Sequence, residues 1–431
     1  MGAYSKEDIL ELIREEDIRL LKLQFTDMYG MPKNVNLPAA KLSKALSGKC
    51  VFDGSSIEGF IRRDEEDMFL HPDLDTFQVF PLSGREGVTA RVICDLYRDE
   101  GRPFMGDPRY ILKRVLEEAK KKGYTFGIKP ELEFFLFNCD ELGNPTTFNN
   151  ETASYFDTTP LDFSENLRNE MVIYLEDMGY QVASSHHETS PGQHEIDFEE
   201  KQGISCADAI ATAKILIKML AKRSGMYATF MPKPKEGVNG SGMHFYMSMY
   251  DREGKDIFFD ADDSHKLSKE GYYFMAGIMK HIPGMSLILN PLVNSYKRIT
   301  PGYDAPVDIS WSAGTYRGSL MRISHTDTDK VRVELRSPDP SCNPYLAFAL
   351  VLSAGLSGLS DKELPDAEGI SRGSLPQNLG QALEEYQRDS FIKEVLGDTI
   401  YLKLLEAKQK EWEEYIKQVS PWEVSKYLYK Y

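Results

Sequence analysis

The segment at residues 126–137, FGIKPELEFFLF, decides which fold the sequence predicts. Its phenylalanine, leucine and isoleucine are typical of a β-strand in a protein interior, yet it also carries Glu131 and Glu133. Residues two apart in a strand face the same side, so the two carboxylates project together. Because a buried carboxylate is costly unless it is paired, the segment predicts a cationic partner on this face.

Length and composition indicate a globular protein of more than one domain. The chain has 431 residues, of which 41% are hydrophobic and 27% charged, enough to build sizeable cores. Its formal net charge of −16 argues against a protein that binds nucleic acid or acidic membranes over a broad basic face. A local basic pocket for phosphate groups stays compatible with that charge.

The cysteines and the apolar segments indicate a cytoplasmic protein. Five widely spaced cysteines without a Cys-x-x-Cys pair are typical of reduced thiols, not of a disulfide framework or a zinc site. The N-terminal segment MGAYSKEDILELIREEDIRLL is charged and lacks the apolar core of a signal peptide. The longest apolar segment, at 345–359, is too short to span a bilayer and is predicted to be a core helix, so we expect no membrane partner.

A polar segment rich in glycine and proline, DEGRPFMG at 99–106, predicts a domain boundary. We expect one domain at 1–103 and a second at 104–431. The strands do not alternate regularly with helices, which favours an α+β fold over a doubly wound sheet. A capping-box variant, Ser205 with Asp208, is expected to open one of the long helices. The expected helices span 5–15, 107–123, 164–179 and 205–225, and the expected strands span 20–30, 90–98, 124–137, 227–231, 242–250 and 330–336.

Three further segments place polar side chains together. They are Arg332, Glu334 and Arg336 in KVRVELRS; His244, Tyr246 and Ser248 in SGMHFYMSM; and His186, Glu188 and Glu195 around the Pro-Gly turn of SSHHETSPGQHEIDF. Five glutamates and one histidine can thereby reach one surface, an oxygen-rich set that suits Mg²⁺ or Mn²⁺ better than zinc. Six ligands suit two ions with three ligands each, and nearby arginines add the positive charge that phosphoryl transfer needs.

Each of these segments alone has a simpler structural interpretation. A Glu-x-Glu pair in a strand is more often a solvated face, Arg-x-Glu-x-Arg is more often a surface ion-pair ladder, and a lone His244 is more often a hydrogen-bonded core residue. The glycine-rich segment GVNGSGMH at 237–244 lacks the Lys-Ser/Thr of a Walker A loop. Only the coincidence of these segments favours metal-dependent phosphoryl chemistry. The residues alone do not identify the substrate or the reaction.

Six motifs, taken in order, resemble glutamine synthetase of type I. They are FDGSSIEGF, KPELEFFLF, SSHHETSPGQHEIDF, NGSGMHF, NSYKRITPGYDAP and RVELRSPDPSCNPYLAFAL, and they cover nearly the whole chain. The resemblance implies a small N-terminal β-grasp domain followed by a large catalytic domain with a curved antiparallel sheet flanked by helices. It also implies ATP-dependent ligation of ammonia to the γ-carboxylate of L-glutamate through γ-glutamyl phosphate, giving L-glutamine, ADP and phosphate.

The resemblance further implies a role for individual residues. Of two Mg²⁺ or Mn²⁺ ions per site, one would be bound by Glu133, Glu188 and Glu195, and the other by Glu131, His244 and Glu334. Glutamate would contact Asn239, Gly240, Arg298 and Arg336, and ATP would contact Phe198, Ser248, Arg317, Arg322 and Arg332. Arg317 would also stabilise the transferred phosphoryl group. Ammonium would be bound and deprotonated by Asp53 and Asp304, beside Tyr155 and Ser56.

The same resemblance implies a homo-oligomer. Asp53 would reach the active site of the adjacent subunit, in a dodecamer of two stacked hexamers joined by the C-terminal tail. No adenylylation loop is evident in the sequence, which matches the bacterial subclass that is regulated by direct feedback. In that subclass Arg62 would sense glutamine; an ordinary surface charge is the alternative for Arg62. A nitrogen-regulatory transcription factor is left open as a further partner.

Four features depart from the family pattern. The flap reads PGYDAP, so Asp304 replaces a longer glutamate, and one extra residue precedes Arg317. Ala183 stands where a nucleotide-contacting glutamate is common, and Tyr246 stands where His or Asn is common. These departures keep two alternatives open: a γ-glutamyl ligase for another amine of the polyamine type, and a non-catalytic regulatory relative.

Overall fold

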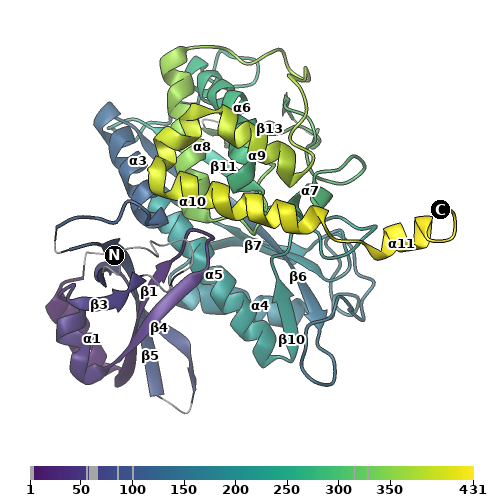
Figure 1. Ribbon diagram of the computed structural model, residues 1–431. Coiled ribbons are helices and arrows are strands. Elements are labelled where there is room, and N and C mark those ends of the chain that lie inside the picture. The colour runs from purple at the N-terminus through teal and green to yellow at the C-terminus, as the bar shows by residue number, and fades with distance from the viewer. Residues whose placement is uncertain are drawn as a thin grey trace.

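The computed structural model describes residues 4–54, 57, 67–84, 87–99, 101–314, 316–327 and 330–431. Two sheets organise these residues, a five-stranded sheet near the N-terminus and a nine-stranded sheet in the rest of the chain (Figure 1). Each sheet contributes to its own hydrophobic core, and helices pack on both. The predicted α+β class is therefore confirmed.

The N-terminal sheet has the strand order β2-β1-β5-β4-β3. Its elements are α1 (Lys6–Glu15), β1 (Ile18–Thr26), β2 (Pro32–Pro38), a 3₁₀ turn (Ala39–Lys41), α2 (Leu42–Ala45), β3 (Cys50–Asp53), β4 (Asp67–Gly84) and β5 (Gly87–Tyr97). Strands β1 and β5 are parallel, whereas the other neighbouring pairs are antiparallel. Ile9 and Ile13 of α1 share one core with Leu21 and Leu23 of β1, so the amphipathic face of α1 covers the sheet.

Strand β6 (Thr125–Asn138) contains the FGIKPELEFFLF segment and lies in the middle of the larger sheet. The other strands are β7 (Val182–His187), β8 (Gln193–Phe198), β9 (Lys201–Gln202), β10 (Met226–Thr229), β11 (Phe245–Tyr250), β12 (Trp311–Ala313), β13 (Met321–Asp327) and β14 (Lys330–Leu335). Strand β6 pairs with β8, β9, β10 and β11, all antiparallel. Strands β12 and β13 are parallel, so the predicted antiparallel sheet is mixed at this edge. The loop between them returns the chain to the same end of the sheet, as parallel pairing requires.

Helices accompany the larger sheet in the rest of the described chain. They are α3 (Pro108–Lys122), α4 (Glu165–Asp177), α5 (Gly203–Arg223), α6 (Lys269–Leu289), α7 (Ser295–Arg298), α8 (Pro344–Asp361), α9 (Leu379–Arg388), α10 (Ser390–Ile416) and α11 (Pro421–Tyr427). Helix α5 packs on β6 and β10, and Leu132, Phe134 and Leu136 of β6 are fully buried in the shared core. Because side chains alternate along β6, Glu131 and Glu133 project from its opposite face.

Helix α8 is long and apolar enough to span a membrane by length and composition, and no second helix of the described residues meets that test. In the fold it is a core helix, since 72% of its apolar window is buried and it packs against α3, α5 and α6. The apolar segment at 345–359 is thus buried as predicted.

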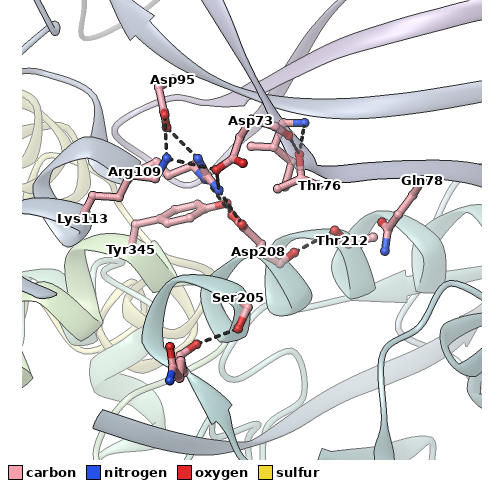
Figure 2. A network of polar contacts seen from close by, with 12 residues as sticks. Asp73, Thr76, Gln78, Asp95, Arg109, Lys113, Ser205, Asp208, Thr212 and Tyr345 are labelled. Carbon is pink, nitrogen blue, oxygen red and sulfur yellow. Dashed lines mark hydrogen bonds and ion pairs between the residues drawn. The ribbon is translucent and has the colours of Figure 1, made fainter. Parts of the chain in front are cut away.

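A buried ion network joins the N-terminal sheet to the helices of the larger part (Figure 2). Arg109 of α3 contacts Asp73 of β4 at 2.8 Å and Asp95 of β5 at 2.7 Å. The same guanidinium contacts Asp208 of α5 at 2.8 Å, and the hydroxyl of Tyr345 donates to Asp208 at 2.7 Å. Arg109 is 3% exposed, so these charges are shielded from solvent and hold two β-strands against three helices.

Capping residues predicted most helix ends correctly. Ser5 begins α1 with a capping box, and α3 begins after Asp107 and ends at Gly123, whose φ of 95° favours glycine. The predicted start at Ser205 was wrong: α5 begins at Gly203, and the Ser205 hydroxyl donates to the carbonyl of Gln202 and does not cap. Eight strands were not predicted: β2, β3, β4, β7, β8, β9, β12 and β13. Strands β3, β9 and β12 are short, and the polar and proline residues in β4 mask its alternation.

Candidate active site

The exposed face of β6 borders a cavity of about 690 Å³. The cavity brings together most of the predicted site residues: Glu131, Glu133, Tyr155, Glu188, Glu195, Asn239, Gly240, His244, Arg298, Asp304, Arg317, Arg322, Glu334 and Arg336. Of the other predicted residues that the structure describes, Asp53, Phe198, Ser248 and Arg332 lie outside this lining. Ser56 and Arg62 fall outside the described residues.

The register of β6 and β8 builds a patch of four carboxylates. Glu133 lies opposite Glu195, and Glu131 lies opposite Asp197. Directly opposed residues of an antiparallel pair have neighbouring side chains, and residues two apart share a face. The four carboxylates therefore lie together at one end of the cavity, where like charges repel unless cations separate them.

The predicted ligand set of Glu131, His244 and Glu334 comes together in the structure. His244 Nδ1 lies 3.1 Å from Glu131 Oε2 and 3.4 Å from Glu334 Oε1. The ligand atoms of these three residues all lie within 4.8 Å of one another, close enough to share one ion. Glu131 comes from β6, His244 from the residue before β11 and Glu334 from β14, so three adjacent strands supply one ligand each.

In the predicted ligand set of Glu133, Glu188 and Glu195, His186 takes the place next to the last two residues that was expected for Glu133. Glu188 and Glu195 form a compact group with His186, whose ring lies 3.6 Å from Glu188 Oε1 and 3.7 Å from Glu195 Oε2. Glu133 lines the same cavity, but its carboxylate accepts hydrogen bonds from Gln193 Nε2 and from the Gly242 N–H, each at 2.8 Å. Glu188 and Glu195 are thus brought together as predicted, with Glu133 adjacent.

Burial changes the pKa values of these groups in a consistent direction. It raises the pKa of Glu133 to about 8, with a further contribution from the charge of Glu188. It raises the pKa of Glu195 well above its usual range, with Asp197 adding to the effect, and it raises the pKa of Glu131. Burial and then Arg336 lower the pKa of His244 to about 3, so its ring is neutral, as a metal ligand requires.

These residues fit a divalent cation. The donor set is dominated by carboxylate oxygens with single imidazoles, which suits Mg²⁺ or Mn²⁺. Asp197 Oδ1 is buried and lacks a hydrogen-bond partner in the described part of the chain, and it belongs to a further group with Glu131 and Glu195. A cation would relieve both the repulsion and the unpartnered oxygen.

Arginines line the same cavity as the carboxylates. Glu334 accepts from Arg322 Nε at 2.5 Å and lies 3.2 Å from Arg336 Nε. Arg336 Nη1 is buried and has no hydrogen-bond partner among the described residues, so it is available to a bound anion. The guanidinium of Arg298 is held by the carbonyls of Ser337 at 2.8 Å and of Arg336 at 3.2 Å.

Glycines let the 239–242 segment approach the arginines and carboxylates closely. A Cβ on Gly240 would lie 2.2 Å from the carbonyl oxygen of Pro232. A Cβ on Gly242 would lie 2.6 Å from Arg298 Nη2 and 2.9 Å from His244 Nε2. All three distances are shorter than real contacts allow, so only glycine fits at these positions without displacing the cavity wall.

The flap residue Asp304 reaches this segment. The side-chain amide of Asn239 donates to the Asp304 carboxylate, and the Asp304 N–H donates back to Asn239 Oδ1 at 3.4 Å. The shorter side chain of Asp304 thus still contacts the rim of the cavity. Tyr155 lies on the same rim, with its ring centroid 5.4 Å from that of His186. Asp53 is exposed at the end of β3, in the N-terminal sheet.

A polar cluster centred on Glu200 lies outside the cavity lining and was missed by sequence reasoning. Glu200 Oε2 accepts from Ser248 Oγ at 2.9 Å and from Arg332 Nε at 2.8 Å, and Glu200 Oε1 accepts from the Tyr250 hydroxyl at 2.5 Å. A Cβ on Gly127 would lie 2.3 Å from Glu200 Oε1, so glycine there makes room for the carboxylate. Two residues predicted to bind ATP, Ser248 and Arg332, therefore share one acidic partner.

His186, Asp197 and Gln193 are the other site residues that the sequence did not assign. His186 is part of the quoted motif, but the sequence did not show that it lies opposite Glu195. That contact depends on the register between β7 and β8. Asp197 is two residues from Glu195, and this spacing was the signal that could have identified it. Gln193 carries no charge, and its contact with Glu133 depends on the β6–β8 pairing.

The fold and the site together define an α+β enzyme of two domains whose cavity sets carboxylate groups for cations against arginines for anionic groups. Residues 17–99 match the family of the glutamine synthetase β-grasp domain, and residues 105–427 match that of the glutamine synthetase catalytic domain. The chain belongs to the glutamine synthetase family.

Curated relatives of similar length carry that name. A glutamine synthetase of Clostridium saccharobutylicum is 46% identical over 447 aligned residues, covering 100% of both chains. A glutamine synthetase of Methanosarcina mazei is 46% identical, covering 98% of both chains. Among solved structures, a GmaS/ADP complex and apo GmaS without ligand each have a TM-score of 0.88 at 29% identity, covering 98% of this chain and 99% of theirs.

Proposed function

We propose that this cavity ligates ammonia to the γ-carboxylate of L-glutamate at the expense of ATP, giving L-glutamine, ADP and phosphate. The observation that carries the proposal is one cavity in which buried carboxylates with raised pKa values face Arg317, Arg322 and Arg336. Membership of the glutamine synthetase family, whose enzymes use ATP and divalent cations, supports the same activity. We place the chain in the cytoplasmic, type I class of that family.

We propose two divalent cations, Mg²⁺ or Mn²⁺, per site. Glu131, His244 and Glu334 hold one, and Glu188 and Glu195 hold the other, with Glu133 beside them. When bound, the cations neutralise phosphate oxygens and polarise the phosphorus for attack. The raised carboxylate pKa values support this assignment, as does Asp197 Oδ1, which lacks a hydrogen-bond partner in the part of the chain that the structure describes.

The arginines and the glycine segment bind and orient the substrates. Backbone carbonyls fix the orientation of Arg298, and Arg336 Nη1 has no hydrogen-bond partner among the described residues. Arg298 and Arg336 hold the glutamate carboxylates beside Asn239 and Gly240. This places the γ-carboxylate oxygen in line with the terminal phosphate of ATP, and γ-glutamyl phosphate forms as ADP leaves. Arg317 and Arg322 compensate the charge that moves with the phosphoryl group.

Ammonia requires a base, since the nucleophile is the neutral amine. Asp53 of an adjacent subunit binds ammonium, and Asp304, at the cavity rim, helps to take its proton beside Tyr155. Ser56, which falls outside the described residues, is assigned to the same site. The carbon–nitrogen bond then forms as phosphate leaves. We assign ATP contacts to Ser248, Arg332 and the backbone near Phe198, at the end of the sheet face beyond Glu334.

The test is ADP release by the full chain with Mg²⁺, glutamate and ammonium, with the product identified by mass spectrometry. Ammonium-dependent formation of glutamine in step with ADP is expected. E334Q, which removes the charge of a carboxylate that is 1% exposed, controls for ADP from contaminants and is expected to be inactive.

A second candidate is a γ-glutamyl ligase for a larger amine, favoured by the shorter flap residue Asp304. An amine panel that includes a polyamine separates the two. ADP release that ignores ammonium but follows another amine would replace the first proposal with the second, and binding of ATP without any turnover would indicate a regulatory relative.

We also propose that the chain assembles as a dodecamer of two stacked hexamers. The last helix, α11, projects from the rest of the chain (Figure 1), and Trp422, Leu428 and Tyr429 are exposed by 62%, 65% and 94%. Apolar surface of this extent at a chain end calls for another copy to cover it. The receptor we assign is a second cavity of about 840 Å³, which α5, β10 and α10 line.

Two finer assignments accompany this proposal. The domains divide between residues 103 and 104, and Arg62 senses glutamine for feedback inhibition in the non-adenylylated subclass. Replacement R62A is expected to weaken glutamine inhibition and to leave turnover intact, because a sensing residue does not contact the reacting atoms. Unchanged inhibition would remove Arg62 from that role.

A further inference from the structure

We propose that a buried hydrogen-bond network behind the cavity positions Glu188 and Glu195 for their divalent cation. This inference rests on the proposed function, which gives these two glutamates a shared ion. We name it the back-face network; its members are Glu151, Asp162, Arg168, His187 and His194.

The strand register puts this network directly behind the two glutamates. In the β7–β8 pair His186 lies opposite Glu195, and His187 lies opposite His194. Neighbouring residues of a strand face opposite sides, so His187 and His194 point away from the cavity that His186 and Glu195 line. Both back-face histidines are fully buried, and their rings meet edge to face with centroids 4.9 Å apart.

The first arm of the network connects Glu151 to the backbone of Glu188. His187 Nε2 lies 2.9 Å from Glu151 Oε1, and His187 Nδ1 lies 2.6 Å from the carbonyl oxygen of Glu188. The second oxygen of Glu151 accepts the N–H of Phe163 at 3.1 Å, which fixes the carboxylate from the other side. The His187 ring therefore connects the position of Glu151 to that of the Glu188 backbone.

The second arm reaches the residue before Glu195. Arg168 Nη1 lies 2.9 Å from His194 Nδ1 and 2.5 Å from Asp162 Oδ2. Arg168 belongs to α4, and Asp162, in the loop before that helix, also accepts the N–H of Ser164 at 2.9 Å. Helix α4 thus anchors β8 at the position next to Glu195.

Repulsion within the carboxylate patch explains why such anchoring matters. Glu188 and Glu195 line the cavity beside Glu133, and these carboxylates repel one another when they are ionised and no cation separates them. On the cavity side Glu188 accepts from the N–H and hydroxyl of its neighbour Thr189, at 2.9 and 3.2 Å, and lies 3.6 Å from the His186 ring. The back-face network supplies the opposing hold, in the way that outer-shell partners orient metal ligands elsewhere.

The experiment measures Mn²⁺ binding to the full chain by electron paramagnetic resonance, without nucleotide or glutamate. In E151Q and in R168Q, one of the two Mn²⁺ ions is expected to bind about tenfold more weakly, and the other is expected to be unchanged. E151D restores a carboxylate and is expected to recover part of the affinity. If E151Q does not fold, H187Q, which keeps an amide for Glu151 and loses the donor to Glu188, carries the same prediction.

The matched control breaks a similar pair far from the cavity. His281 Nδ1 lies 2.7 Å from Asp389 Oδ2, and His281 is 9% exposed, so H281N removes a buried histidine–carboxylate contact of the same kind. It is expected to lower the melting temperature as much as E151Q and to leave both Mn²⁺ affinities unchanged. Unchanged Mn²⁺ binding in E151Q and R168Q, equal weakening of both ions, or the same weakening in H281N would overturn the inference. Absence of Mn²⁺ binding in the unmodified protein would instead overturn the proposed function.

Discussion

At the scale of single residues, Gly242 is a steric constraint on the site. G242A is expected to lower kcat/KM by about 100-fold with little change in melting temperature, because its Cβ would displace Arg298 and His244. Steady-state kinetics and thermal melts measure the two effects. Gly101, where an added Cβ meets nothing within 4 Å, provides the control G101A, which is expected to change neither. Normal activity of G242A would show that the wall can relax.

Glu133 predicts a pH dependence of metal binding. Its pKa of about 8 means that the carboxyl of the metal-free protein holds a proton below that pH, and a cation must displace it. Apparent Mn²⁺ affinity is therefore expected to fall about tenfold per pH unit below 8, and E133Q is expected to flatten this dependence. Calorimetric titrations at pH 6.5 to 8.5 measure it. A flat profile in the unmodified protein would contradict the assignment.

The same shift has a defined sign for stability. The folded-state pKa of Glu133 is raised above its ordinary value of 4.5, so the metal-free native state binds more protons between 4.5 and about 8. Its contribution to the free energy of unfolding therefore falls as pH rises through that window. Melting of the metal-free protein is expected to respond to pH less steeply in E133Q than in the unmodified chain.

Glu200 tests the assignment of the nucleotide end of the site. E200Q keeps the shape of the side chain and removes the charge that holds Ser248 and Arg332. The KM for ATP is expected to rise about tenfold, the value of one charge-assisted hydrogen bond, while the KM for glutamate stays constant. Initial rates with each substrate varied separately measure this. Equal changes in both constants would indicate a general structural effect.

At the scale of elements, the N-terminus of α3 carries the contact between the two sheets. R109M is expected to cost about 3–5 kcal/mol of unfolding free energy, because Asp208 keeps a buried charge without its main cation. Urea unfolding measures the loss. R102A removes the exposed pair with Asp99 at the same junction and is expected to change stability by less than about 0.5 kcal/mol. Similar effects of both variants would mean that the network contributes no more than a surface pair.

At the scale of the whole molecule, α11 decides the assembly. Truncation after Ile416 is expected to halve the particle mass by separating the two rings, since the exposed Trp422 and Tyr429 are lost. Light scattering measures the mass. Turnover per chain is expected to persist, because no residue beyond 416 lines the described cavity. K430A changes the same tail without removing apolar surface and serves as the control; an unchanged mass after truncation would place the ring contact elsewhere.

Local patterns in the sequence were sufficient to predict the elements that carry the site. The alternation in FGIKPELEFFLF predicted a strand with Glu131 and Glu133 on one face, and the structure has β6 there with its even-numbered neighbours in the core. Capping residues predicted α1 and α3, because caps act within one turn of the helix. At α5 the same reasoning was wrong by two residues, since Ser205 met a nearby carbonyl.

The sequence by itself determined which residue types face the cavity, because strand alternation and helix capping follow from covalent geometry over a few residues. Only the tertiary structure decided which side chains meet. The β7–β8 register brings His186 to Glu195 and puts His187 and His194 behind them, and strand pairing joins Glu200 to Arg332. Such contacts depend on register between segments far apart in the chain, where a slip of one residue would send every side chain to the other face.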